Sequence, residues 1–167
     1  MQNKLTDNII DVCKVLGKHS VQYLIVGGTA VALHGYFRQS MDTGGQPADK
    51  LDFDFWYSPT YTNYFNLLSA LQELGQDVEK FKNESAPNPR KSFFKFETEL
   101  FTLDFLPELK GLTKFRDCFQ NKEIVKLQGT EIWFISYLDL IKDKEENARP
   151  KDLIDIEQLK IKKGKQQ

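Results

Sequence analysis

The sequence predicts an α/β or α+β domain with a mixed central sheet flanked by helices. Two observations support this class. Stretches with apolar residues at helical spacing alternate with short apolar runs that are typical of strands. A length of 167 residues, 40% of them apolar, is enough to bury one hydrophobic core. We therefore expect a single domain over residues 1–167, with C-terminal helices in residues 136–162.

The N-terminal elements follow from apolar spacing and from the positions of glycine and proline. Apolar residues recur at helical intervals over Leu5–Leu16, whereas Tyr23–Val26 is a continuous apolar run typical of a buried strand. Ser58 followed by Pro59 is a typical helix start. The expected elements are helix Leu5–Leu16, strand Tyr23–Val26, helix Thr29–Tyr36, loop Phe37–Lys50, strand Leu51–Tyr57 and a helix from Ser58 to Gly75.

The C-terminal half predicts a loop, two strand pairs and two helices. Residues Asp77–Lys91 are charged and contain two prolines, so we expect an exposed loop there. Ser136 is the expected cap of one helix, and Pro150 opens the last. The expected elements are strands Ser92–Thr98, Leu100–Leu106, Glu123–Leu127 and Glu131–Phe134, and helices Ser136–Asn147 and Pro150 onward.

Composition excludes several classes. The formal net charge of −1 argues against a strongly basic nucleic-acid-coating protein. The apolar stretch Tyr23–Phe37 is broken by glycines and is shorter than the ~20 residues of a spanning helix, so no membrane segment is expected. Cys13 and Cys118 lie far apart and follow no secretory signal, which indicates a cytoplasmic protein. The sequence contains only two histidines, which argues against a histidine-rich zinc site and against a Ser-His-Asp hydrolase.

Two acids on the strand Leu51–Tyr57 are the first candidate site residues. Asp52 and Asp54 are two positions apart, so their side chains project from one face, and Phe53 and Phe55 project from the other. Neighbouring carboxylates repel unless a cation or a shared proton is present, and Mg²⁺ or Mn²⁺ prefers such oxygen ligands. The alternative is a strand whose polar face meets water.

Asp104 is the third candidate, in the middle of the apolar strand Leu100–Leu106. A buried carboxylate is costly unless it is paired or bound to metal. If this strand neighbours Leu51–Tyr57, Asp104 completes a cluster that can bind metal and accept a proton from an attacking hydroxyl. The alternative is an edge position that faces solvent.

Gly27, Gly28 and Thr29 lie between the first strand and the next helix. Glycine permits close backbone approach there, and helix N–H groups attract phosphate. The alternative is that the glycines only allow the chain to turn from strand to helix and bind no phosphate. The segment is neither a P-loop nor a dinucleotide-binding fingerprint.

Taken together, the segments 24–38 (LIVGGTAVALHGYFR) and 51–55 (LDFDF) resemble the signature of minimal nucleotidyltransferases of the polymerase-beta-like superfamily. The C-terminal segments 134–144 and 149–156 are also similar to the prokaryotic, AbiEii-related, toxin-like branch. The resemblance spans about residues 23–159. It implies a nucleotidyltransferase fold and a metal-dependent enzyme that moves a nucleoside monophosphate from a nucleoside triphosphate to a hydroxyl of RNA, protein or a small molecule.

The resemblance also assigns roles to residues. Gly27 and Gly28 match the glycine pair of the family, and Asp52, Asp54 and Asp104 match its metal-binding acids. The recurring basic positions, for which phosphate contacts are implied, are Arg38, Lys144, Arg149 and Lys151. Lys144 and Lys151 are equally compatible with a solvated helix face.

One departure from the family is a longer connection between Arg38 and Asp52. Asp42 within it is a rival for the first acid position, and the insertion is alternatively a substrate loop. We prefer Asp52 because it lies in a strand-like alternation. We expect His34 to pack on its apolar helix rather than act in catalysis.

Several functional alternatives stay open from sequence. One is a non-catalytic module that binds a nucleotide or a protein partner on the same fold. Among acceptors, an RNA predicts a basic surface, whereas a cationic antibiotic predicts an acidic pocket. The candidate basic residues for RNA are Lys80, Lys82, Arg90, Lys91, Lys95 and the tail Lys160–Lys165.

Overall fold

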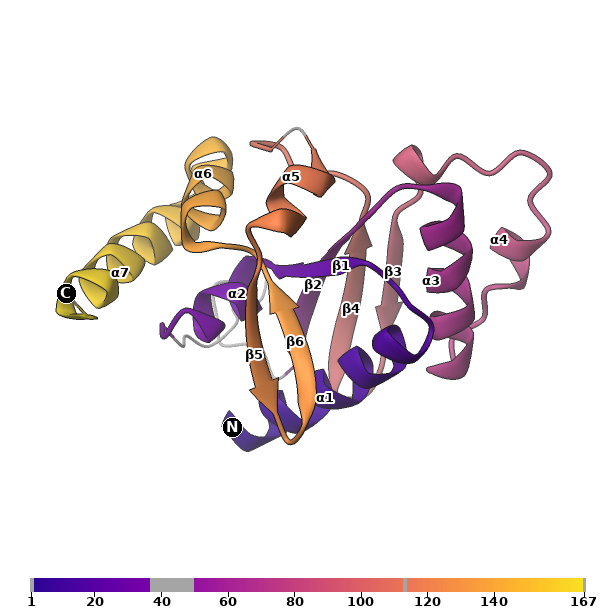
Figure 1. Ribbon diagram of the computed structural model, residues 1–167, viewed down its shortest axis with the longest axis horizontal. Coiled ribbons are helices and arrows are strands. Elements are labelled where there is room, and N and C mark those ends of the chain that lie inside the picture. Colours follow the sequence, from indigo (N-terminus) through magenta and orange to yellow (C-terminus); the bar gives the residue numbers. More distant parts are fainter. Residues whose placement is uncertain (1, 37–49, 113, 167) are drawn as a thin grey trace.

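The computed structural model describes residues 2–36, 50–112 and 114–166. Within these ranges, a mixed sheet with the strand order β3-β4-β2-β1-β6-β5 has helices on both faces (Figure 1). The helices are α1 (Gln2–Lys18), α2 (Gly27–Leu33), α3 (Tyr61–Glu73), α4 (Glu79–Lys82), α5 (Phe115–Gln120), α6 (Tyr137–Asn147) and α7 (Pro150–Gln166), with a 3₁₀ turn at Pro89–Lys91. The strands are β1 (Tyr23–Val26), β2 (Leu51–Tyr57), β3 (Phe94–Glu97), β4 (Phe101–Leu106), β5 (Glu123–Leu127) and β6 (Thr130–Phe134).

The sheet is mixed because its central strands pair in both senses. β2 is parallel to β4 and antiparallel to β1. β1 is in turn parallel to β6, and the two edge strands β3 and β5 are antiparallel to their neighbours. The predicted fold class is therefore confirmed. The pairing of β2 with β4 also meets the condition under which Asp104 lies beside Asp52 and Asp54.

One face of the sheet carries the aromatic core. Phe55 and Phe105 stack with their ring centroids 4.8 Å apart, and both are fully buried. α3 covers this face through Tyr64, whose ring lies 5.9 Å from that of Phe94. α1 covers it through Cys13, which is hydrogen-bonded to Tyr23. This burial fixes the strand register and turns the alternate residues of β2 and β4 to the opposite face.

The opposite face is covered by α2 and, at Trp56, by α5. α2 packs on β1 and β2, and α6 packs on both α7 and α2. In Figure 1 α6 and α7 lie together on the side of the molecule away from α3 and α4. The start of α2 therefore borders the polar face of β2.

Two helix starts differ from the prediction. α2 begins at Gly27, not at Thr29, because Gly27 itself turns the chain out of β1. α3 begins at Tyr61 with Thr60 as its cap, not Ser58, since the Thr60 hydroxyl accepts the Asn63 N–H. Tertiary pairing with the segment before β1 keeps Ser58 extended, because its N–H donates to Gln22 O at 3.3 Å.

Short helices lie where the prediction had none. The expected loop Asp77–Lys91 contains α4 and the 3₁₀ turn. α5 was not predicted, and it is held by tertiary packing: Phe115 meets the Trp56 ring edge-to-face at 5.2 Å. In the part of the chain that the structure describes, no helix is long and apolar enough to cross a membrane.

Candidate functional site

Charged side chains form a row across the polar face of β2, β4 and β3. Asp54 is in register with Asp104 of the parallel strand β4, and Asp104 is in register with Lys95 of the edge strand β3. Residues in register project from the same face of a sheet. Asp54, Asp104 and Lys95 therefore lie side by side, opposite the aromatic core.

Gly27 makes room for the first member of this row. A Cβ placed on Gly27 would lie 2.4 Å from Oδ2 of Asp54, which is closer than real Cβ atoms approach. The φ angle of Gly27 is +66°, in the left-handed region that favours glycine. Residue 27 thus needs glycine for its backbone and for the space that Asp54 occupies. The Asp54 carboxylate consequently lies against the backbone at the start of α2, which also contains Gly28.

Asp54 and Asp104 form a carboxylate pair. Burial raises the pKa of Asp54 to about 7, with further contributions from the charge of Asp104 and a hydrogen bond to it. Burial also raises the pKa of Asp104. Among the described residues, Oδ1 of Asp104 is buried without a hydrogen-bond partner. Such a pair favours either a shared proton or a bound cation.

Asp52 lies one row away and is more exposed. Its Oδ1 accepts a hydrogen bond from the Thr102 hydroxyl, and its backbone carbonyl accepts one from Thr29 Oγ1 at 3.1 Å. Thr29 thus uses its hydroxyl to tie α2 to β2. In the described ranges, no group of three or more His, Cys, Asp or Glu side chains is arranged as a metal site. Asp54 and Asp104 are paired directly, with Asp52 beside them.

Two cations at the start of α7 act electrostatically on this row. Lys151 lowers the pKa of Asp54, against the larger effect of burial. The pKa of Arg149 is raised, chiefly by its hydrogen bond to Asp152 and to a smaller extent by Asp54. The structure therefore brings Arg149 and Lys151 into the electrostatic range of the acid pair.

Lys144 lies between the two C-terminal helices and binds two carboxylates. Its side chain is almost fully buried between α6 and α7, where Nζ lies 3.2 Å from Asp152 and 2.9 Å from Asp155. The interpretation as a solvated helix face is therefore wrong, because the helical spacing did not reveal these two carboxylates. The lysine joins the two C-terminal helices.

His34 packs as expected, and two other predicted residues are not described. Nε2 of His34 is hydrogen-bonded to Ile135 O at 2.8 Å, and its ring meets Phe134 edge-to-face. Burial lowers the pKa of His34. Arg38 lies outside the described residues, as does Asp42, the rival of Asp52 for the first acid position.

Two residues of the site were not predicted from the sequence. Thr102, which binds the Asp52 carboxylate, is two positions before Asp104 on the same strand face. Lys95 was considered only as part of a basic surface, whereas it lies beside Asp104 and lowers its pKa. The alternation of β3 predicts the face of Lys95, but its partner depends on the strand order.

Comparisons with known proteins support the fold. No family model matches the sequence, and a search of curated proteins gives no significant match. The structure is similar to the crystal structure of an antigenic nucleotidyltransferase-like protein from Paracoccidioides brasiliensis, with a TM-score of 0.54 and 14% sequence identity. The match covers 94% of this chain and 75% of that chain. At this identity the similarity establishes a nucleotidyltransferase-like fold and nothing finer.

Proposed function

We propose that this chain is a metal-dependent nucleotidyltransferase of the AbiEii-related, toxin-like branch. It transfers a nucleoside monophosphate from a nucleoside triphosphate to a hydroxyl acceptor and releases pyrophosphate. The observation that carries the proposal is the half-buried pair of Asp54 and Asp104 beside Gly27. The nucleotidyltransferase-like fold supports it.

The acid row suits a divalent cation. The buried Oδ1 of Asp104, which has no partner among the described residues, and the mutual repulsion of Asp54 and Asp104 are both relieved by a cation. Mg²⁺ is usually bound by one or two carboxylates together with substrate phosphates, so a complete protein cage is not required. Asp52, Asp54 and Asp104 are the proposed ligands of Mg²⁺ or Mn²⁺. When bound, the ion neutralises charge that develops on the phosphates.

The side chains have separate proposed tasks. Asp104 accepts the proton of the attacking hydroxyl, because its carboxylate lies in the acid row beside Asp54. The hydroxyl oxygen then forms a bond to the α-phosphorus, and the bond from that phosphorus to pyrophosphate breaks. Arg149 and Lys151 neutralise phosphate charge. Further proposed nucleotide contacts are the backbone of Gly27, Gly28 and Thr29, and the side chain of Arg38.

Lys144 is left out of the proposed phosphate contacts. Both of its carboxylate partners are fully buried, and its own side chain is 4% exposed. An ammonium group held in this way does not reach a phosphate without breaking two ion pairs. We therefore propose a structural role for Lys144.

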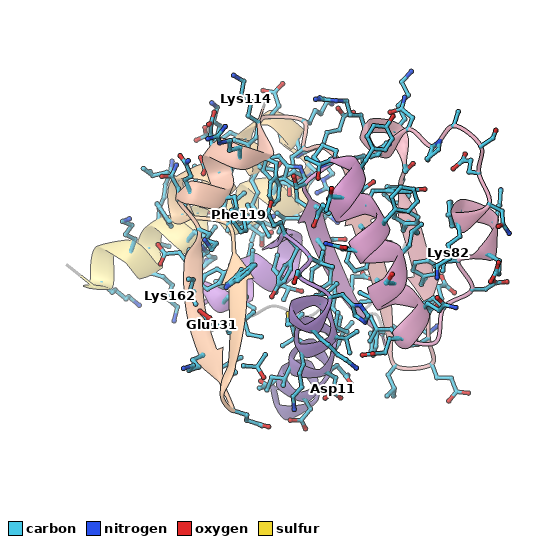
Figure 2. All side chains as sticks on the ribbon, turned by 45° about the vertical axis from the view of Figure 1, so that its right-hand side comes forward. Asp11, Lys82, Lys114, Phe119, Glu131 and Lys162 are labelled. Atoms are coloured by element: carbon cyan, nitrogen blue, oxygen red, sulfur yellow. The ribbon has the colours of Figure 1, made fainter. Side chains whose placement is uncertain are left out.

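The acceptor is proposed to be an RNA that meets the protein near the acid row. Lys95 is next to Asp104 on the edge strand, and Lys91 and Arg90 precede that strand in the 3₁₀ turn. The other candidate lysines are dispersed: Figure 2 shows Lys82 and Lys162 on opposite sides of the molecule. The expected setting is the cytoplasm, where the free thiols of Cys13 and Cys118 stay reduced.

The test is magnesium-dependent binding of each radiolabelled nucleoside triphosphate to the wild type and to Asp54→Asn and Asp104→Asn. Asp11→Asn is the matched control, because this exposed carboxylate lies on α1, which covers the other face of the sheet (Figure 2). We expect binding by the wild type and the control, and loss of binding in both site variants. No binding by the wild type would favour a non-catalytic module that binds a protein partner.

A further inference from the structure

A fully buried carboxylate in the first turn of α7 binds three groups at once. Asp152 accepts hydrogen bonds from the Arg149 side chain, with Nε at 2.6 Å and Nη2 at 3.2 Å. It also accepts the backbone N–H of Arg149 at 3.1 Å. Lys144 Nζ reaches the same carboxylate from α6 at 3.2 Å. Both oxygens of Asp152 are therefore engaged, and its relative exposure is 0%.

This arrangement fixes the orientation of the Arg149 guanidinium. A bidentate arginine–carboxylate contact sets the plane and direction of the guanidinium group as well as its distance. The contact uses the Nε–Nη2 edge, while the Arg149 side chain is 56% exposed. The N–H groups of the opposite edge are thus left available to a ligand, and the charge of Asp54 reaches Arg149.

A buried ion pair is by itself a weak source of stability. Removing two charges from water costs several kcal/mol per ion, and well-packed apolar residues often replace such a pair without loss. The cluster of Lys144, Asp152 and Asp155 nevertheless places two acids and one lysine in the interior. Arg149 supplies the additional positive charge that Asp152 binds.

We propose that Asp152 is a positioning residue that holds the Arg149 guanidinium toward the phosphates of a nucleotide bound at Asp54 and Asp104. This inference rests on the proposed function. Asp152 does not touch the nucleotide itself; it acts through Arg149. The competing explanation is that Asp152 serves only to join α6 to α7.

Asp155 separates the two explanations. It is as fully buried as Asp152, lies on the same helix and pairs with the same Lys144 at 2.9 Å. A purely structural role predicts that Asp152→Asn and Asp155→Asn weaken the protein and its nucleotide binding alike. A positioning role predicts a loss of nucleotide affinity that is specific to Asp152→Asn.

The experiment measures the Kd of radiolabelled ATP and GTP with Mg²⁺, and the melting temperature, for the wild type, Asp152→Asn, Asp155→Asn, Arg149→Gln and the Arg149→Gln/Asp152→Asn double variant. We expect Kd to rise about tenfold or more in Asp152→Asn and in Arg149→Gln, and less than about threefold in Asp155→Asn. Because Asp152 acts through Arg149, the double variant is expected to bind no more weakly than Arg149→Gln alone.

The outcomes are distinguishable. Equal loss of affinity in Asp152→Asn and Asp155→Asn, or additive losses in the double variant, would overturn the positioning role while leaving the proposed function intact. Absence of nucleotide binding in the wild type would overturn the proposed function instead. If Asp152→Asn does not fold, Asp152→Glu provides the comparison: it keeps the charge but moves the carboxylate by one methylene, so a positioning role still predicts weaker binding.

Discussion

Oδ2 of Asp54 occupies the space into which any side chain at residue 27 would project, at 2.4 Å from a Cβ on Gly27. This relationship links the glycine pair to the acid strand. The glycine is required because the carboxylate must come close to the backbone at the start of α2. Substitution of Gly27 therefore tests the site directly, since a methyl group at residue 27 must displace Asp54.

Gly27→Ala is therefore expected to weaken both folding and nucleotide binding. The substitution adds the strain of a positive φ and a clash with the Asp54 carboxylate. We expect the free energy of unfolding to fall by roughly 2–4 kcal/mol.

Gly129→Ala is the matched control: Gly129 also has a positive φ, of +80°, but a Cβ there meets nothing within 4 Å. The control should lose about 1–2 kcal/mol in urea unfolding and keep nucleotide binding. Equal nucleotide binding by Gly27→Ala and Gly129→Ala would contradict the claim that residue 27 must leave space for Asp54.

The Asp54 carboxyl predicts a specific dependence of stability on pH. Its pKa is raised from 3.8 to about 7 in the folded protein, so the folded state binds more protons than the unfolded state between these values. Stability from this group is therefore present at low pH and is lost as the pH rises from about 4 to about 7. Asp54→Asn should flatten this part of the profile and raise the unfolding free energy at pH 8 by on the order of 1–3 kcal/mol.

Urea unfolding at several pH values, without added metal, checks this prediction. Asp11→Asn serves again as control, because it replaces an exposed carboxyl on the other face of the sheet. An unchanged slope between pH 4 and pH 7 in Asp54→Asn would contradict the assignment. Added Mg²⁺ should restore stability to the wild type at pH 8, because the cation binds the ionised pair.

Lys144→Ala is expected to be among the most destabilising substitutions in the C-terminal helices. It leaves Asp152 and Asp155 buried next to each other with less positive charge. Breaking a buried pair in this way costs roughly 3–5 kcal/mol. Lys142→Ala on the same helix is the control, since Lys142 is exposed, and we expect a change within about 0.5 kcal/mol. Thermal unfolding of the two variants measures the difference.

The acid strand could be predicted from sequence because its signal is local. Alternation of apolar and acidic residues over Leu51–Tyr57 determines which side chains share a face. Burial of the aromatic face in the core then leaves the acidic face on the other side of the sheet. The position of Asp104 beside Asp54 required one further fact, the pairing of β2 with β4, which the sequence pattern leaves open. The prediction was conditional, and the structure meets its condition.

The remaining site features depend on contacts between distant segments. The interior position of Lys144 follows from the packing of α7 on α6. The local helical pattern does not predict this packing. α5 has a short apolar face that is stabilised by Trp56 rather than by its own propensity. Thr60 rather than Ser58 caps α3 because pairing to Gln22 keeps Ser58 extended. In each case a tertiary contact overrides the local signal.

The last prediction concerns Lys95, which lies on the edge strand β3 and affects the pKa of Asp104. Its positive charge lowers the pKa of Asp104, against the larger effect of burial. Lys95→Met removes the charge and keeps most of the side-chain volume, so the pKa of Asp104 should rise further. Carboxyl ¹³C NMR titration measures this shift, and Lys126→Met on β5, at the far edge of the sheet, is the matched exposed control. If the pKa of Asp104 stayed unchanged in Lys95→Met, or rose equally in Lys126→Met, Lys95 would not be acting on Asp104.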